Sequence, residues 1–261
     1  MTTRIAVAGA AGRMGRAILT LALQDKTLAI GGALEQKGSA SLGQDVGGGI
    51  KITDNVTKAL SQADVLIDFT HPSATAGNLE AVLQAKKSYV LGTTGLDEKI
   101  MQQLREAAKT IAIVQSPNMS VGVNLLFKLA ELTARALDES YDIELAEVHH
   151  RMKKDSPSGT AAKLVEIVAA ARKKNLKKDV INGREGQVGE RPKGQIGVFA
   201  LRGGDVVGDH TLSFLGDGER IELTHRATSR DAFAQGALRA AKFVAHQKPG
   251  LYNMSQVLGI A

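Results

Sequence analysis

The sequence predicts an α/β fold, with a Rossmann-like parallel-sheet dinucleotide-binding domain and a smaller α+β domain that contains a mixed sheet. Three observations indicate this fold. Over the first 120 residues, short apolar runs alternate with segments of helical periodicity. A glycine-rich turn with G-x-x-G-x-x-G spacing joins the first run to the first helical segment. Beyond residue 120, strand-like runs follow one another without long helices between them.

The first 120 residues are expected to alternate strand and helix. The predicted strands cover residues 5–8, 28–34, 65–67, 89–91 and 111–114, and the predicted helices cover residues 13–23, 73–84 and 97–109. The strands are apolar runs rather than apolar–polar alternations, which is typical of parallel strands that helices cover on both faces. In the first helix, apolar residues recur at helical spacing on one face: Ile18, Leu19, Ala22 and Leu23.

The pattern changes after Asn118. The predicted helices here cover residues 121–137 and 160–174, and the predicted strands cover residues 143–150, 196–201, 210–215 and 221–225. The turn Asp217-Gly218 is expected to join the last two strands as a hairpin. Such a sheet can leave one face open, and an open apolar face would suit a partner subunit. A last helix over residues 232–246 is expected to return to the first domain, so we assign residues 1–120 and 230–261 to that domain and residues 121–229 to the second.

Composition and charge argue against other classes of protein. Hydrophobic residues make up 43% of the chain and charged residues 23%, which is ordinary for a globular domain. The net charge is +6, but five cations stand in one short run where a helix should end: Arg172, Lys173, Lys174, Lys177 and Lys178. Cations at that place suit the helix dipole. Aromatic residues are only 3%, too few for the stacking platforms of a single-strand binder, so no nucleic-acid partner is expected.

Neither a membrane partner nor export is expected. No apolar run approaches the length of a bilayer-spanning helix, and no basic-then-apolar signal peptide precedes the first predicted strand. Cysteine is absent, which removes disulfides, thiolate metal sites and cysteine nucleophiles. Its absence fits a reducing compartment.

The glycine turn predicts a dinucleotide site. It lies between the first strand and the first helix, where glycines let the backbone approach a pyrophosphate at the helix N-terminus. Glu35 ends the second predicted strand, about 20 residues after Gly15, where an acid binds the adenosine ribose hydroxyls. We therefore expect NADH or NADPH, held by Gly9, Ala10, Ala11, Gly12, Arg13, Met14 and Glu35.

The carboxylate of Glu35 also bears on which cofactor is preferred. A carboxylate suits free ribose hydroxyls and repels a 2′-phosphate, although Lys37 or Arg13 could offset that repulsion. The expectation is that NADH serves at least as well as NADPH.

Two further loops follow later strands of the predicted parallel sheet. Ligands bind at the carboxyl ends of such strands, and Thr and Asn side chains can hydrogen-bond a nicotinamide ribose or carboxamide. The residues expected to contact the cofactor there are Gly92, Thr93, Thr94, Ser116, Pro117, Asn118 and Met119.

The segment from His149 to Thr160 gathers the groups of an anion site. It reads His-His-Arg-Met-Lys-Lys-Asp-Ser-Pro-Ser-Gly-Thr, so two histidines and three cations occupy its first six positions. Histidine titrates near neutral pH, and lysine donates protons or binds anions. The helix start that follows offers free backbone N–H groups to a carboxylate. The segment predicts a pocket that binds a small anion and moves a proton on it.

Together these motifs resemble one family over essentially the whole chain. They are the glycine loop of residues 7–15, Asp68-Phe69-Thr70, Gly92-Thr93-Thr94-Gly95, and the segments 147–153, 155–160, 202–210 and 218–222. The chain resembles the 4-hydroxy-tetrahydrodipicolinate reductases, also called dihydrodipicolinate reductases. One departure is Gln36, where some relatives carry a basic residue that favours the phosphorylated cofactor.

The resemblance implies an activity and a set of roles. It implies NAD(P)H-dependent reduction of a cyclic imine dicarboxylate to tetrahydrodipicolinate in diaminopimelate and lysine biosynthesis, by a cytoplasmic homotetramer. The domain of residues 121–229 would supply the substrate site and the tetramer contacts. His149 matches the family's acid/base and Lys153 its proton donor, and His150 matches a substrate-binding position. Gly159 and Thr160 match the pair that holds a substrate carboxylate.

The chemistry of these residues agrees with the resemblance. Hydride addition to a conjugated imine leaves an electron-rich enamine that must take up a proton, which Lys⁺ or His⁺ can supply. Which of His149 and Lys153 does so stays open. No metal site is expected, because His149 and His150 are adjacent and should point to opposite faces of a strand. His210 and His225 are expected to be structural or interface residues.

Two alternatives remain at this point. One is another Rossmann-type amino-acid dehydrogenase, against which the segment from His149 to Thr160 argues. The other is a non-catalytic NAD-sensing protein that keeps the fold and binds the cofactor without turnover.

Overall fold

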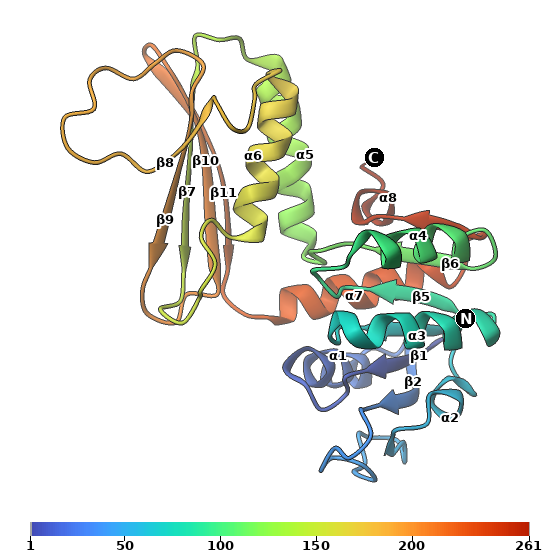
Figure 1. Ribbon diagram of the computed structural model, residues 1–261. Coiled ribbons are helices and arrows are strands. Elements are labelled where there is room, and N and C mark those ends of the chain that lie inside the picture. The colour runs from blue at the N-terminus through green and yellow to red at the C-terminus, as the bar shows by residue number, and fades with distance from the viewer. Residues whose placement is uncertain (1, 261) are drawn as a thin grey trace. The chain divides into compact units, whose positions relative to one another are not determined.

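The computed structural model describes residues 2–260, which form two compact units. Unit 1 joins the chain up to Val121 with the chain from Arg230 onward, and unit 2 is Gly122–Ser229. Each unit contains its own sheet (Figure 1). No helix among the described residues combines the length and the apolar character needed to cross a membrane.

Unit 1 is built on a seven-stranded sheet whose strands all pair in parallel. In spatial order the strands are β12 (Gly250–Tyr252), β6 (Ala112–Gln115), β5 (Ser88–Leu91), β4 (Val65–Asp68), β1 (Thr3–Ala8), β2 (Leu28–Leu34) and β3 (Ile52–Thr53). The predicted Rossmann-like fold is therefore confirmed. The two edge strands, β3 and β12, were not predicted.

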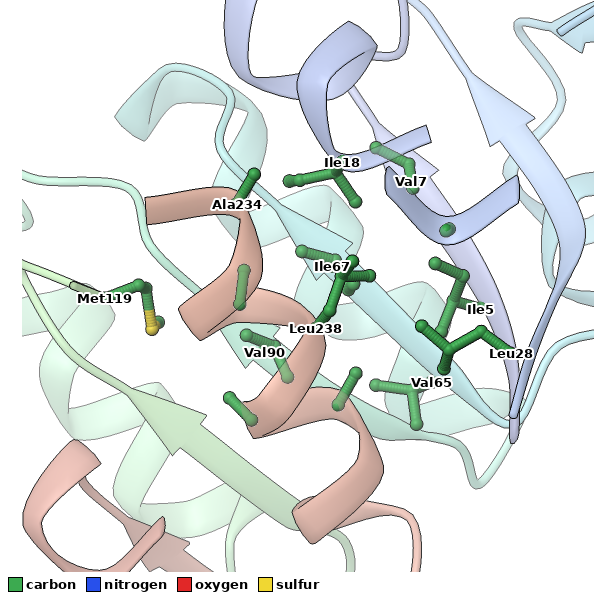
Figure 2. Close-up of a cluster of buried hydrophobic side chains, with 14 of the residues drawn as sticks. Ile5, Val7, Ile18, Leu28, Val65, Ile67, Val90, Met119, Ala234 and Leu238 are labelled. Carbon is green, nitrogen blue, oxygen red and sulfur yellow. The ribbon is translucent and has the colours of Figure 1, made fainter. Parts of the chain in front are cut away.

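Helices cover both faces of this sheet, as the continuous apolar strands predicted. They are α1 (Arg13–Gln24), α2 (Val56–Leu60), α3 (Pro72–Gln84), α4 (Glu98–Ala107), α7 (Asp231–Val244) and α8 (Met254–Leu258). Alternate residues of one strand enter different cores: Ile5 packs with α1 and α7, whereas Ala6 packs with α2, α3 and α4. Figure 2 shows the first of these cores, in which Ile18 and Leu238 lie near Ile67.

Helix α7 completes a core of unit 1 beside α1, although the whole of unit 2 separates these two helices in the sequence. It packs against α1, β4, β5 and β6. The approach is close at Gly236, because a Cβ there would lie 1.7 Å from the carbonyl oxygen of Met119. Any side chain at this position would push α7 away from the loop that carries Met119.

Unit 2 contains a five-stranded mixed sheet, as predicted. In spatial order its strands are β11 (Glu219–Ala227), β10 (Gly208–Gly216), β7 (Asp142–His149), β9 (Ile196–Arg202) and β8 (Val180–Asn182). β9 pairs in parallel with β7 and β8, and the other pairs are antiparallel. The predicted hairpin is confirmed: β10 and β11 are joined by Asp217-Gly218, and Gly218 has a φ of +84°.

The helices α5 (Val121–Ala136) and α6 (Gly159–Ala171) cover one face of this sheet (Figure 1). Their apolar side chains pack on Ile143, Leu145 and Leu212. The opposite face carries Ala146, which is exposed, and Leu201, which is 51% exposed. The run of cations that starts with Arg172 begins at the C-cap of α6, so it lies at a helix end, as predicted.

Candidate active site

The glycine loop lies between β1 and α1, at the carboxyl edge of the parallel sheet. Gly9 has a φ of +71°, a left-handed conformation that glycine adopts without strain. Gly15 packs tightly on this loop, because a Cβ there would lie 2.1 Å from the Gly9 carbonyl oxygen. Gly12 caps α1 without a side-chain hydrogen bond, and the first turn, which begins with Arg13 and Met14, contains no acid. The positive end of α1 is therefore left for an anionic ligand.

Glu35 lies directly after β2 and faces the glycine loop. One of its carboxylate oxygens accepts a hydrogen bond from the backbone N–H of Ala11 at 3.0 Å, and the other accepts one from Gln36 at 3.1 Å. A cavity of about 560 Å³ is lined by the loop and by Glu35, Lys37 and His71, among others. Of the two cations considered near Glu35, Lys37 is the one that lines this cavity. The acid and a cation are thus both available to an adenosine ribose.

The loop after β5 is held by a buried network. Asp68 accepts hydrogen bonds from the hydroxyl of Tyr89 at 2.6 Å, and the hydroxyl of buried Thr93 lies 3.4 Å from it. Gly92 packs against the ring of Phe69, because a Cβ on Gly92 would lie 2.3 Å from that ring. Thr94 is exposed. Thr94 is therefore the residue of this loop whose side chain is free to contact a ligand.

The loop after β6 has a different character. The hydroxyl of Ser116 donates to the carbonyl of Asn118 at 2.7 Å, which closes a tight turn around exposed Pro117. Met119 is 1% exposed and belongs to the core beside α7. Its side chain packs in the core, so a contact with the cofactor would have to come from its backbone.

In unit 2, β7 ends in a buried acid and a buried histidine. Glu147 and His149 stand two residues apart, so both point to the face that α5 and α6 cover, and they are 0% and 8% exposed. Oε2 of Glu147 lies 3.3 Å from Nδ1 of His149 and 3.6 Å from Nε2 of His210, which faces it from β10. Arg202, on β9, donates to Oε1 of Glu147 at 3.0 Å. The ends of three strands thus meet at one carboxylate.

The start of α6 joins this cluster. The backbone N–H of Ser158, the N-cap residue, donates to Oε1 of Glu147 at 2.9 Å. The hydroxyl of Ser158 lies 3.1 Å from Nε2 of His210 and accepts a backbone hydrogen bond from the first turn of the helix. Gly159 and Thr160 are the first two residues of α6, and a Cβ on Gly159 would meet nothing within 4 Å. Open space therefore lies beside Gly159 in the first turn of the helix.

His150 and Lys153 lie in the turn after β7. The backbone N–H of His150 donates to the Val206 carbonyl at 2.7 Å, and the carbonyl of His150 accepts from the N–H of Lys153 at 3.0 Å. The ammonium of Lys153 pairs with Asp155 at 2.9 Å, and its side chain is 19% exposed. Two backbone hydrogen bonds thus fix the turn that carries the lysine.

Two models of known protein families match this chain. A family model described as dihydrodipicolinate reductase, N-terminus, matches residues 3–119. A second, described as dihydrodipicolinate reductase, C-terminus, matches residues 122–258. The chain belongs to the dihydrodipicolinate reductase family. The resemblance drawn from the sequence motifs is confirmed.

Individual members of the dihydrodipicolinate reductase family match over the full length. The 4-hydroxy-tetrahydrodipicolinate reductase of Thiobacillus denitrificans is 51% identical over 266 residues, and that of Aquifex aeolicus is 49% identical over 269 residues. Each alignment covers 100% of both chains. The solved structure of a dipicolinate-bound dihydrodipicolinate reductase from Paenisporosarcina sp. TG-14 superposes with a TM-score of 0.81 at 23% identity, over 97% of this chain and 98% of that one. This last likeness supports the fold.

Burial and the neighbouring groups together set the charge states of this cluster in the reductase. It lowers the pKa of His149 from the ordinary 6.5 to about 4, against the carboxylate of Glu147, which raises it; His210, Lys153 and Arg202 lower it further. Burial alone would raise the pKa of Glu147, but the neighbouring His210, Ser158 and Arg202 hold it well below its usual range. At neutral pH His149 is therefore neutral and Glu147 is ionised.

Four residues of this cluster were not predicted as site residues: Glu147, Ser158, Arg202 and His210. Glu147 carried one usable signal, since an acid two residues before a candidate histidine must share its strand face. His210 was expected to be structural or an interface residue, and the structure brings it against the site. Arg202 and His210 arrive through strand register, His149 opposite Arg202 and Glu147 opposite His210, which no local pattern encodes.

The cluster also bears on the question of a metal. Ligand atoms of Glu147, His149 and His210 all lie within 4.8 Å of one another. The prediction of no metal site considered His149 only with His150, so this grouping was not foreseen. The cations Arg202 and Lys153 act on the same centre and oppose a divalent ion there. The carboxylate is already compensated by these protein groups.

Proposed function

We propose that the protein catalyses the NAD(P)H-dependent reduction of 4-hydroxy-tetrahydrodipicolinate to tetrahydrodipicolinate in diaminopimelate and lysine biosynthesis, a reaction that takes up one proton and releases the 4-hydroxyl as water. One observation carries the proposal. In a chain of this family, buried His149 and partly buried Lys153 stand beside the open start of α6. Proton-transfer groups and a carboxylate site thus occupy one short segment, as an imine dicarboxylate requires.

Unit 1 supplies the cofactor site in this proposal. The fit rests on the uncapped positive end of α1 and on the cavity that Glu35 and Lys37 line. The residues that would hold the dinucleotide are Gly9, Ala10, Ala11, Gly12, Arg13, Met14, Glu35, Gly92, Thr93, Thr94, Ser116, Pro117, Asn118 and Met119. NADH or NADPH supplies the hydride when it is bound.

Unit 2 supplies the proton. Because burial keeps His149 neutral at neutral pH, Lys153 is the group that reaches the reaction with a proton to give. The ion pair with Asp155 holds this ammonium in place until substrate arrives. His149 acts as the acid/base beside it, and His150 contacts the substrate ring.

The substrate carboxylate is assigned to the start of α6. The backbone N–H of Gly159 and the hydroxyl of Thr160 are its ligands, and the space beside Gly159 leaves room for them to be reached. The N-cap hydrogen bond of Ser158 and its link to Glu147 fix this helix end before substrate binds. A fixed helix end can bind the carboxylate without being ordered in the process.

A homotetramer in the cytoplasm completes the proposal. The face of the unit 2 sheet that α5 and α6 do not cover supports it, because exposed Leu201 and Ala146 lie there beside partly buried Phe199 and Val148. Light scattering should give four times the chain mass of 27.5 kDa, and Leu201→Lys should lower it. A wild-type protein that is monomeric at micromolar concentration would contradict the assembly without touching the reaction.

The reaction is tested by mixing the protein with freshly made substrate and NADH and following the nicotinamide absorbance. We expect steady oxidation by the wild type, and a kcat lower by about 10²- to 10⁴-fold in His149→Gln with little change in KM. Binding of NADH without any loss of absorbance over buffer would favour a non-catalytic NAD-sensing protein. Equal kcat values in the two proteins would remove His149 from the mechanism.

A further inference from the structure

Glu147 is a fully buried acid, and the proposed reaction so far uses only its link to Ser158. It lies on β7, where β9 and β10 are its neighbours, and it is 0% exposed. A charge this deep is costly unless its partners compensate it, so a position that keeps one has a reason to do so. Its two carboxylate oxygens face different parts of the site.

Oxygen Oε1 holds the carboxylate-binding end of α6. It accepts the N–H of Ser158 at 2.9 Å and the guanidinium of Arg202 at 3.0 Å. Ser158 directly precedes Gly159 and Thr160, so this bond sets where the substrate carboxylate is held relative to β7.

Oxygen Oε2 faces His149. It lies 3.3 Å from Nδ1 of that ring, yet neither atom has a well-aligned hydrogen-bond partner among the described residues. A buried polar atom without a hydrogen-bond partner is unfavourable. A small rotation of the ring would let Nδ1–H donate a hydrogen bond to Oε2, which would satisfy both atoms. The geometry therefore favours the neutral tautomer of His149 that carries its proton on Nδ1.

The other ring nitrogen then carries the lone pair, through which the ring can take up a proton and pass it on. Nε2 of His149 lies against Gly208, where a Cβ would come within 2.9 Å. The missing side chain lets the ring sit in this orientation. Glu147 on one side and Gly208 on the other thus fix the ring.

We propose that Glu147 is a positioning residue: one carboxylate orients His149 and anchors the carboxylate-binding start of α6. The inference rests on the proposed function, because it assigns Glu147 a part in that reaction. The groups that face His149 are Glu147 on its own strand, His210 on β10, Arg202 on β9 and Lys153 on the following turn. Glu147 is the acid in this set, so its loss leaves the ring among cations.

The first test is a double-mutant cycle. Glu147→Gln keeps the shape and an acceptor for Ser158 but loses the charge; we expect kcat to fall at least about tenfold, as part of the general acid/base contribution is lost. If Glu147 acts through His149, the double variant with His149→Gln should be no more than about threefold slower than His149→Gln alone. The proposal is overturned if the fold reductions in kcat of the two single variants multiply in the double variant. Glu166→Gln, an exposed acid on α6, is the matched control and should keep wild-type kcat.

The second test does not depend on turnover. Nitrogen-15 NMR of labelled wild-type protein at neutral pH should show His149 neutral with its proton on Nδ1, and Glu147→Gln should shift that population toward the Nε2 tautomer. A wild-type ring protonated on Nε2 would overturn the proposal, even if Glu147→Gln fails to fold. A wild type with the Nδ1 tautomer but no turnover would refute the proposed function and leave the positioning by Glu147 standing.

Discussion

Replacing His149 with Gln should make unit 2 more resistant to acid. Burial lowers the pKa of this histidine from 6.5 to about 4. Between these two values the unfolded chain binds a proton at this ring and the folded chain does not. Stability therefore falls as the pH is lowered through this window. Glutamine takes up no proton, so the variant should lack this part of the pH dependence.

The expected size follows from the width of the window. Each pH unit between the folded and unfolded pKa values is worth about 1.4 kcal/mol, so the wild type should lose about 3 kcal/mol through His149 on going from neutral pH to about pH 4. The lowered pKa of Glu147 also makes the protein less stable as the pH falls. That contribution to stability is fully present above the ordinary pKa of 4.5 and is lost only below it. Burial also lowers the pKa of His225, which is present in both proteins. In the upper part of the window, the difference between wild type and His149→Gln therefore reports on His149.

The assay is urea unfolding at a series of pH values between about 7 and 4.5, at one ionic strength and one protein concentration. Stability should fall more steeply for the wild type than for His149→Gln, by about 2–3 kcal/mol over the series. His150→Gln is the matched control, because its neighbouring ring is only partly buried, and it should follow the wild type. Parallel curves for wild type and His149→Gln would refute the reasoning.

Three further predictions concern other parts of the molecule. Thr160→Ala should raise KM for the dicarboxylate about tenfold with little change in kcat, since one hydrogen bond to a charged group is lost; an unchanged KM would remove Thr160 from the carboxylate site. NADH should give a kcat/KM at least equal to that of NADPH, because Glu35 lines the cavity and its carboxylate would repel a 2′-phosphate; a preference of about tenfold or more for NADPH would contradict this role. Gly236→Ala should lower the stability of unit 1 by about 3 kcal/mol or more, because its Cβ would lie 1.7 Å from the Met119 carbonyl, and a melting temperature within a degree or two of wild type would show that α7 can shift at little cost.

Long, strongly patterned elements were predictable from the sequence. The turn Asp217-Gly218 fixed both the hairpin and its register, and the observed strands extend the predicted ones only at their ends. A two-residue turn leaves every flanking residue able to pair, so strand length is set by where pairing stops. The short elements β3, β8 and β12 were missed because two or three residues carry no periodicity, and their pairing depends on a neighbouring strand.

The candidate site divides in the same way. Twelve consecutive residues contain His149, Lys153, Gly159 and Thr160, so a local sequence pattern was enough to predict them. Glu147 connects His149 to the start of α6, and its role depends on its partners on β9, β10 and α6. Whether those partners reach Glu147 depends on strand order and register in a mixed sheet, which a local pattern does not contain.

The return of α7 to unit 1 has a consequence for the order in which the chain can fold during synthesis. Residues of α7 such as Ala237 and Leu238 are part of the first core, but the ribosome makes them only after all of unit 2. Unit 2 is a continuous segment and can complete its core first. Until α7 is made, one face of the nascent parallel sheet is covered by α1 but lacks α7, so a ribosome that stalls before Arg230 leaves an apolar surface for chaperones to shield.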